Sequence, residues 1–120
     1  MKKTVTIGGI NVVWESSGDI PRMYRNIFGK DLFVQMSVFE QRASKGKNVS
    51  LDAGDIEMFE NLAWCFAKHA DPDTPDIDTW LRQFPSLAIL NAAPEIIDMW
   101  AGENLSTSTL KKRNGPSTDK

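Results

Sequence analysis

The densest group of side chains that could hold a metal or move a proton lies in the run His69-Ala70-Asp71-Pro72-Asp73-Thr74-Pro75-Asp76-Ile77-Asp78. Several carboxylates close to an imidazole resemble the oxygen-rich loops that bind hard divalent cations. The run lacks the sixth-position glycine and the final glutamate of the known calcium loop, however. Turn-forming residues at Asp71–Pro75 and a helix N-cap at Asp76 explain the same residues. We therefore expect no metal here and no cofactor in this protein.

Nucleophilic catalysis is the second chemistry to consider. The chain has one cysteine and one histidine, Cys65 and His69, and side chains four residues apart on a helix can touch. Cys65 lies in an apolar helical pattern between Trp64 and Phe66, with no carboxylate on the correct face to orient the imidazole. We interpret Cys65 as a buried, inert thiol. Gly8-Gly9 lacks the helix and lysine of a phosphate loop, so we expect a protein that is not an enzyme.

The elements that position these residues begin with a β-hairpin. Thr4–Ile7 and Ile10–Trp14 alternate in polarity and are rich in β-branched residues, and Gly8-Gly9 between them supplies the positive φ of a primed turn. The pattern after the hairpin predicts helices over residues 20–28, 31–43, 52–70, 77–84, 86–92 and 94–101. The fold class is therefore mainly α (α+β): an N-terminal hairpin and about five or six short-to-medium helices in one domain.

The helix expected over residues 52–70 has the clearest signals. Asp52 is a suitable N-cap, and Lys68 and His69 near the other end complement the helix dipole. Its apolar positions form one wide stripe, which predicts that this helix lies at the centre of the core. The stripe consists of Ile56, Met58, Phe59, Leu62, Ala63, Cys65, Phe66 and Ala70.

The chain divides into a folded part, residues 1–105, and a basic tail, residues 106–120. Ser, Thr, Gly, Pro and Lys dominate the tail, and no apolar residue follows Leu110. Such a segment buries too little surface to offset its ordering entropy, so we expect it to be disordered.

Charge is distributed unevenly along the chain. Residues 1–50 have a balance of +4, residues 51–103 of −9 and residues 104–120 of +3, which returns the overall −2. The acidic middle argues against a general nucleic-acid binder. The separation favours association with a protein, a second copy of this chain included, although solubility explains it equally well. No apolar run is long enough to cross a bilayer and the start lacks a signal-peptide core, so we expect a soluble cytoplasmic protein.

Three aromatic residues on the short helices of the C-terminal half are candidates for partner binding. Trp80, Phe84 and Trp100 lie near carboxylates at what the sequence indicates is the edge of a small domain. Large apolar side chains in such a place line a partner-binding groove or belong to the core, and the sequence leaves both open.

Five segments in order carry a resemblance to a known family, and the first reads P-x-x-Y-R-x-x-F-G-x-D directly after the hairpin. They are Pro21–Leu32, Asp55–Trp64, Ala67–Pro72, Trp80–Phe84 and Pro94–Trp100. In order and spacing they are similar to tail assembly chaperones from long-tailed, siphovirus-type phages and prophages of Gram-positive bacteria. The resemblance covers roughly residues 4–104.

The resemblance implies a helper without catalytic residues that acts in the host cytoplasm and is absent from the mature virion. Such a protein binds the tape-measure protein, keeps that long apolar helical chain soluble, and recruits subunits of the major tail (tube) protein. The family commonly makes a longer isoform by a programmed −1 ribosomal frameshift near the C-terminus. Lys111 and Lys112 mark the corresponding position here, because lysine codons can form the A-rich slippery sequence.

Two other classes stay open. A prophage-encoded regulator could bind nucleic acid through the basic N-terminal half, and a structural head–tail joining protein would remain in finished particles. Neither a nucleic acid nor a membrane is the partner that we expect.

Overall fold

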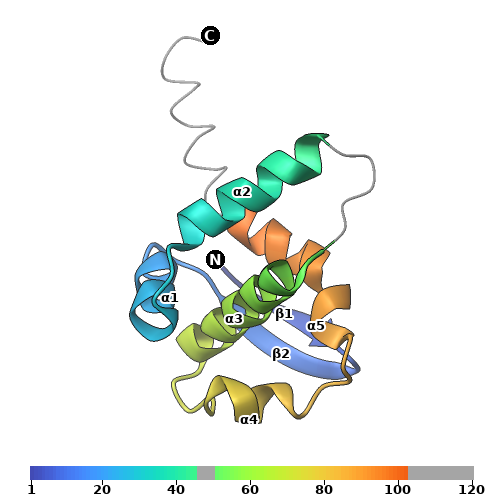
Figure 1. Ribbon diagram of the computed structural model, residues 1–120. Coiled ribbons are helices and arrows are strands. Elements are labelled where there is room, and N and C mark those ends of the chain that lie inside the picture. Colours follow the sequence, from blue (N-terminus) through green and yellow to red (C-terminus); the bar gives the residue numbers. More distant parts are fainter. Residues whose placement is uncertain (46–50, 103–120) are drawn as a thin grey trace, which may run out of the picture.

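The chain begins with a two-stranded antiparallel hairpin, β1 (Lys2–Ile7) and β2 (Ile10–Glu15), in a computed structural model that describes residues 1–45 and 51–102 (Figure 1). Ile7 pairs with Ile10 across a two-residue loop. Both loop residues have positive φ, 56° at Gly8 and 84° at Gly9, as the sequence predicts for a primed turn. Alternation along the strands buries Val5, Ile7, Val12 and Trp14.

Helices make up most of the chain after the hairpin, so the expected α+β class is confirmed. They are α1 (Ile20–Phe28), α2 (Leu32–Lys45), α3 (Ala53–Ala70), α4 (Ile77–Leu81), α5 (Ala88–Asn91) and a last helix over residues 93–102. The expected division at residue 105 and the tail 106–120 lie outside the described residues.

The expected helix boundaries on both sides of Pro85 are wrong, and this proline accounts for them. The helix expected over residues 77–84 ends at Leu81, and the next begins at Ala88 instead of residue 86. A proline disfavours the helical conformation of the residue before it and has no amide hydrogen to donate. The chain therefore turns at residues 82–84, where the amide of Phe84 donates to the carbonyl of Leu81 at 3.1 Å.

Helix α3 is the centre of the core, as its stripe predicts. It crosses the hairpin, with the other helices around it (Figure 1). On one side Phe66 packs against Trp14 of β2, with ring centroids 5.5 Å apart, and Phe59 meets Phe39 of α2 edge-on at 5.2 Å. Within the stripe only Ile56 and Ala70 are half-buried.

The opposite side of α3 is covered as well. Trp64 packs against Phe28 of α1 with ring centroids 5.8 Å apart, and its indole Nε1 donates to the carbonyl of Pro75 at 2.8 Å. Asn61 and Ala67, which lie outside the predicted stripe, are also buried. Every residue of α3 from Asn61 to Ala67 is buried, so other parts of the domain enclose this stretch of the helix on all sides.

Candidate partner-binding surface

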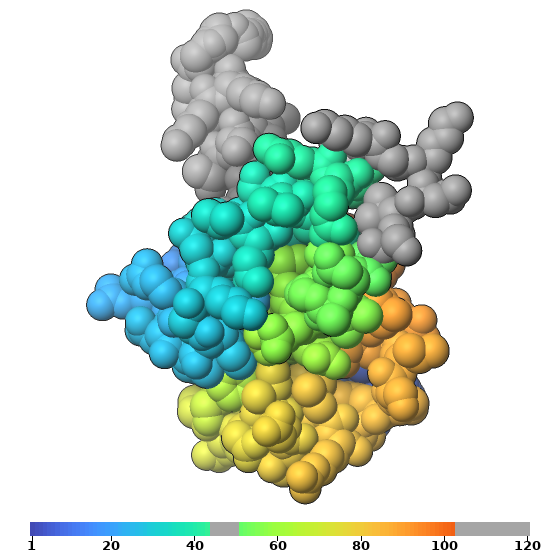
Figure 2. Space-filling model, viewed as in Figure 1, coloured from blue at the N-terminus to red at the C-terminus, as the bar shows by residue number. Residues whose placement is uncertain are grey.

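The outward face of α2 is the main exposed apolar feature of the described residues. Phe33, Val34 and Val38 are 53%, 57% and 50% exposed. Ser37 and Gln41 lie beside them on the same side of the helix, so this side carries no charge from residue 33 to residue 38. We call Phe33, Val34 and Val38 the α2 face; α2 forms the upper part of the described surface in Figure 2.

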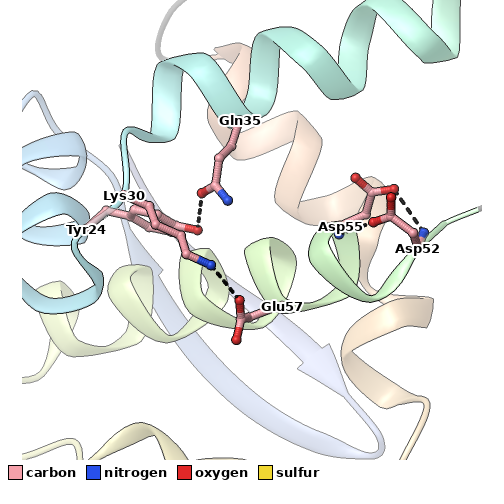
Figure 3. A network of polar contacts seen from close by, with 6 residues as sticks. All are labelled: Tyr24, Lys30, Gln35, Asp52, Asp55 and Glu57. Carbon is pink, nitrogen blue, oxygen red and sulfur yellow. Dashed lines mark hydrogen bonds and ion pairs between the residues drawn. The ribbon is translucent and has the colours of Figure 1, made fainter.

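The residues of α2 that pack against the core determine which of its side chains point outward. Leu32, Met36 and Phe39 are buried against the rest of the domain. On the same side the hydroxyl of Tyr24 in α1 donates to Oε1 of Gln35 at 2.7 Å (Figure 3). Burial raises the pKa of Tyr24 from 10.0 to about 12.

Two ion pairs fasten the ends of α2 and its connection to α3. Nζ of Lys30, just before α2, lies 2.9 Å from Oε1 of Glu57 (Figure 3). Arg42, in the last turns of α2, bonds the carboxylate of Asp55, a residue that also completes the capping box of α3. The buried side chains of Leu32, Met36 and Phe39 set which side of α2 faces the core, and the ion pairs add contacts to α3, so the α2 face points outward.

A hollow of about 260 Å³ adjoins the α2 face at Phe33. Its walls are the link between β2 and α1, the first turns of α1, Phe33 and Trp100. The rings of Phe33 and Trp100 are in contact, with centroids 5.2 Å apart and planes inclined by 58°. Arg22 and Arg25 line the hollow, and none of the other described residues that line it is a carboxylate.

The three aromatic residues predicted to bind a partner lie in the core. Trp80, Phe84 and Trp100 are 4%, 9% and 7% exposed, and the rings of Trp80 and Phe84 pack edge-on with centroids 4.9 Å apart. Of the two interpretations that the sequence leaves open, these positions agree with core packing. Their role in binding stays a prediction, and Trp100 is the one of the three that lines the hollow beside the α2 face.

The α2 face itself was missed at the level of sequence, although a signal exists. Leu32-Phe33-Val34 is a continuous apolar run at the start of a helix, and one buried stripe cannot accommodate all three side chains. The excess of apolar residues over what one stripe needs was the available indication of a second, outward apolar face.

Cys65 and His69, the candidates for nucleophilic catalysis, have structural surroundings. Cys65 is fully buried, and desolvation raises the pKa of its thiol to about 12, which agrees with an inert thiol. Nε2 of His69 lies 2.9 Å from Oγ of Ser17, in the link between β2 and α1. No group of three or more His, Cys, Asp or Glu converges as metal ligands within residues 1–45 and 51–102.

The acidic run forms the turn and cap that the sequence predicts. The amide of Asp73 donates to Oδ1 of Asp71 at 3.0 Å. Asp76 is the N-cap of α4, where its carboxylate accepts from the amide and the hydroxyl of Thr79, and these hydrogen bonds lower the pKa of Asp76.

The frameshift position, Lys111 and Lys112, lies outside the described residues. Among the described helices, none has the length and apolar character needed to span a membrane.

Comparisons with known proteins identify no relative of this chain. No family model matches it, and neither the curated proteins nor the solved structures contain a match to it. The function must therefore be inferred from the residues and surfaces of this chain.

Proposed function

We propose that this protein is a phage tail assembly chaperone that binds the tape-measure protein, keeps it soluble and recruits tail-tube subunits in the bacterial cytoplasm. The support from sequence is the ordered resemblance over residues 4–104. The structural observation that carries the proposal is the α2 face, where three large apolar side chains are about half exposed on a helix with both ends held by ion pairs.

The α2 face suits a helical apolar chain as its partner. Two helices pack when the side-chain ridges of one enter the grooves of the other, and a helix offers its ridges at three- and four-residue spacing. Val34 and Val38 have this spacing, because they are four residues apart, and Phe33 adjoins Val34. Fully burying one such side chain contributes about 1.5–3 kcal/mol. One copy therefore binds weakly, and many copies along a long chain can shield it.

The same surface explains why a helper of this kind can be released. An interface of three side chains and no buried ion pair has a fast dissociation rate compared with a standard-size interface. The longer isoform, made by slippage at Lys111-Lys112, then supplies the segment that brings tail-tube subunits to the coated tape measure. Recoding both lysines with AAG removes the A-run while leaving the peptide unchanged; persistence of the longer product after recoding would contradict this part of the proposal.

Co-expression with the tape-measure protein from the same phage or prophage tests the proposal. The double substitution Val34→Ser and Val38→Ser leaves the core intact, so the domain folds while the α2 face loses its apolar character. We expect the wild-type chain to keep the tape-measure protein in the soluble fraction and the double variant to lose most of this effect.

A matched control is Val13→Ser, on the outer side of β2, where the valine is 42% exposed. It removes an exposed valine outside the α2 face and should retain full activity. If the α2 double variant protects the tape-measure protein as well as wild type does, the α2 face is not the binding surface. If the wild-type chain itself gives no protection, or is found in finished particles, the chaperone function is wrong.

A further inference from the structure

The hollow beside Phe33 has the size and walls to receive one side chain of a partner. It measures about 260 Å³, and a protein cavity of about 150 Å³ already accommodates a benzene molecule. Phe33 and Trp100 form an aromatic wall, and Ile20 and Pro21 add aliphatic surface. A branched aliphatic or aromatic side chain can therefore enter, with most of its new contacts apolar.

Two arginine side chains line this hollow. Arg22 and Arg25 are one turn apart on α1, both are exposed, and both line the hollow. No ion pair to either guanidinium occurs within the part of the chain that the structure describes. Two arginines on one side of an apolar hollow favour a carboxylate that approaches beside the apolar group, since arginine can bind a carboxylate with two parallel hydrogen bonds.

The hollow and the α2 face form one continuous surface, because Phe33 belongs to both. We propose that this hollow is the anchor site for a helical segment of the partner that carries a large aliphatic side chain with a glutamate or aspartate beside it on the same helix face. The aliphatic side chain enters the hollow and packs against the rings of Phe33 and Trp100. The carboxylate pairs with Arg22 and Arg25, and the next turns of the segment lie along Val34 and Val38.

Net charge argues against residues 103–120 of this chain as the occupant of the hollow. The chain continues past Gly102, and residues 103–120 carry a balance of +2. Two arginines repel such a segment, whereas they attract an acidic helix of a partner. The inference rests on the proposed function, since it specifies what the partner of the α2 face must carry.

The experiment compares two synthetic helical peptides of about 20 residues, long enough to form measurable helix in water. Both have leucine at i, i+3, i+4 and i+7, and they differ only in glutamate or glutamine at the positions beside the leucines. Affinity for the full-length protein is measured by calorimetry at low and at high salt. We expect the glutamate peptide to bind about fivefold more tightly at low salt, as two partly exposed ion pairs allow, and this advantage to shrink in high salt.

Variants of the full chain locate the binding site. In the double variant Arg22→Gln and Arg25→Gln, the two peptides should bind with equal affinity, whereas Arg82→Gln, an exposed arginine outside the hollow, should retain the preference. Phe33→Ala should weaken both peptides. The indole NMR signal of Trp100 should shift when either peptide binds the wild-type chain.

Three results would overturn the inference: equal affinity of wild type for the two peptides, a preference that survives loss of both arginines, or binding that leaves the Trp100 signal unchanged. Each is separable from failure of the chaperone function. If any of them occurs while Val34 and Val38 are still needed to keep the tape-measure protein soluble, the anchor site is wrong and the function stands. If the arginine-dependent preference holds but the tape-measure protein is not bound, the anchor site stands and its partner is another acidic helix.

Discussion

Helices α2 and α3 are both rich in apolar residues, but the domain covers them to different extents. Each has apolar residues around much of its circumference, more than one buried stripe needs. The domain encloses α3, where Phe59, Trp64 and Phe66 meet α2, α1 and β2. Only the inner side of α2 is covered, and its outer side leaves Phe33, Val34 and Val38 exposed.

The contrast shows that an apolar surplus in a helix has two possible meanings. In α3 the surplus is used inside the domain, because other elements surround the helix. In α2 no described element lies over the outer side, so the surplus is available to another molecule. An exposed apolar face of this kind on a folded domain commonly marks an interaction site.

Truncating one phenylalanine in each helix tests this contrast most strongly. Phe66→Ala removes a fully buried ring in contact with Trp14 and should lower the free energy of unfolding by about 3–5 kcal/mol. Phe33→Ala removes a ring that is 53% exposed and should cost about 1 kcal/mol. Urea denaturation measures both. Similar costs for the two substitutions would show that α2 is not the less enclosed helix.

The turn of the hairpin lies against Pro85 in the α4–α5 link, and Gly8 tests that contact. A Cβ on Gly8 would lie 2.6 Å from Cδ of Pro85, and the φ of Gly8 is positive. We expect Gly8→Ala to cost about 2–3 kcal/mol, from left-handed strain and overpacking together. Gly9→Ala meets no atom within 4 Å and should cost about 1–2 kcal/mol. Thermal unfolding compares the two, and equal costs would mean that Pro85 does not press on the turn.

The cap of α3 provides a smaller effect with a matched control. The carboxylate of Asp52 accepts from the amide of Asp55 at 2.8 Å, so Asp52→Ala should destabilise the protein by about 1 kcal/mol. Asp19 is the N-cap of α1, but its side chain makes no capping hydrogen bond, so Asp19→Ala should be nearly neutral. Denaturant melts at neutral pH measure both. A larger loss for Asp19→Ala would show that the roles of the two caps are reversed.

The buried thiol of α3 gives the smallest effect, as a dependence on pH. Burial raises the pKa of Cys65 from 9.0 to about 12. As the pH rises, the thiol deprotonates in the unfolded chain before it does so in the folded protein. The contribution of the thiol to the free energy of unfolding is therefore fully present below pH 9 and is lost as the pH rises toward 12. Between pH 7.5 and 9.5 we expect Cys65 to account for a loss of about 0.8 kcal/mol.

Denaturation midpoints across that pH interval measure the loss, and Cys65→Ala is the control because it has no thiol to titrate. The fall in stability over the interval should be smaller in Cys65→Ala than in wild type by the amount assigned to the thiol. Identical slopes for the two proteins would show that Cys65 is not buried as the structure places it.

The local elements were largely predictable. Gly8-Gly9 predicted the hairpin, Asp52 and Asp76 predicted the starts of α3 and α4, and the stripe through Phe59 and Phe66 predicted the central helix. These signals depend on backbone conformation and on hydrogen bonds within a few residues, which neighbouring residues specify. The ends of α4 and α5 were predicted less well, because Pro85 interrupts a weak helical pattern.

The residues of the candidate site could not be predicted from the sequence alone. By itself the sequence determined that large apolar side chains exist at Phe33, Trp80, Phe84 and Trp100 in a domain with a hairpin and several short helices. Only the tertiary structure decided that Trp80 and Phe84 are enclosed and that Phe33 is half exposed beside Trp100 and two arginines. The physical reason is that burial depends on what packs against a side chain from distant parts of the chain, and apolar residues of either fate look alike in sequence.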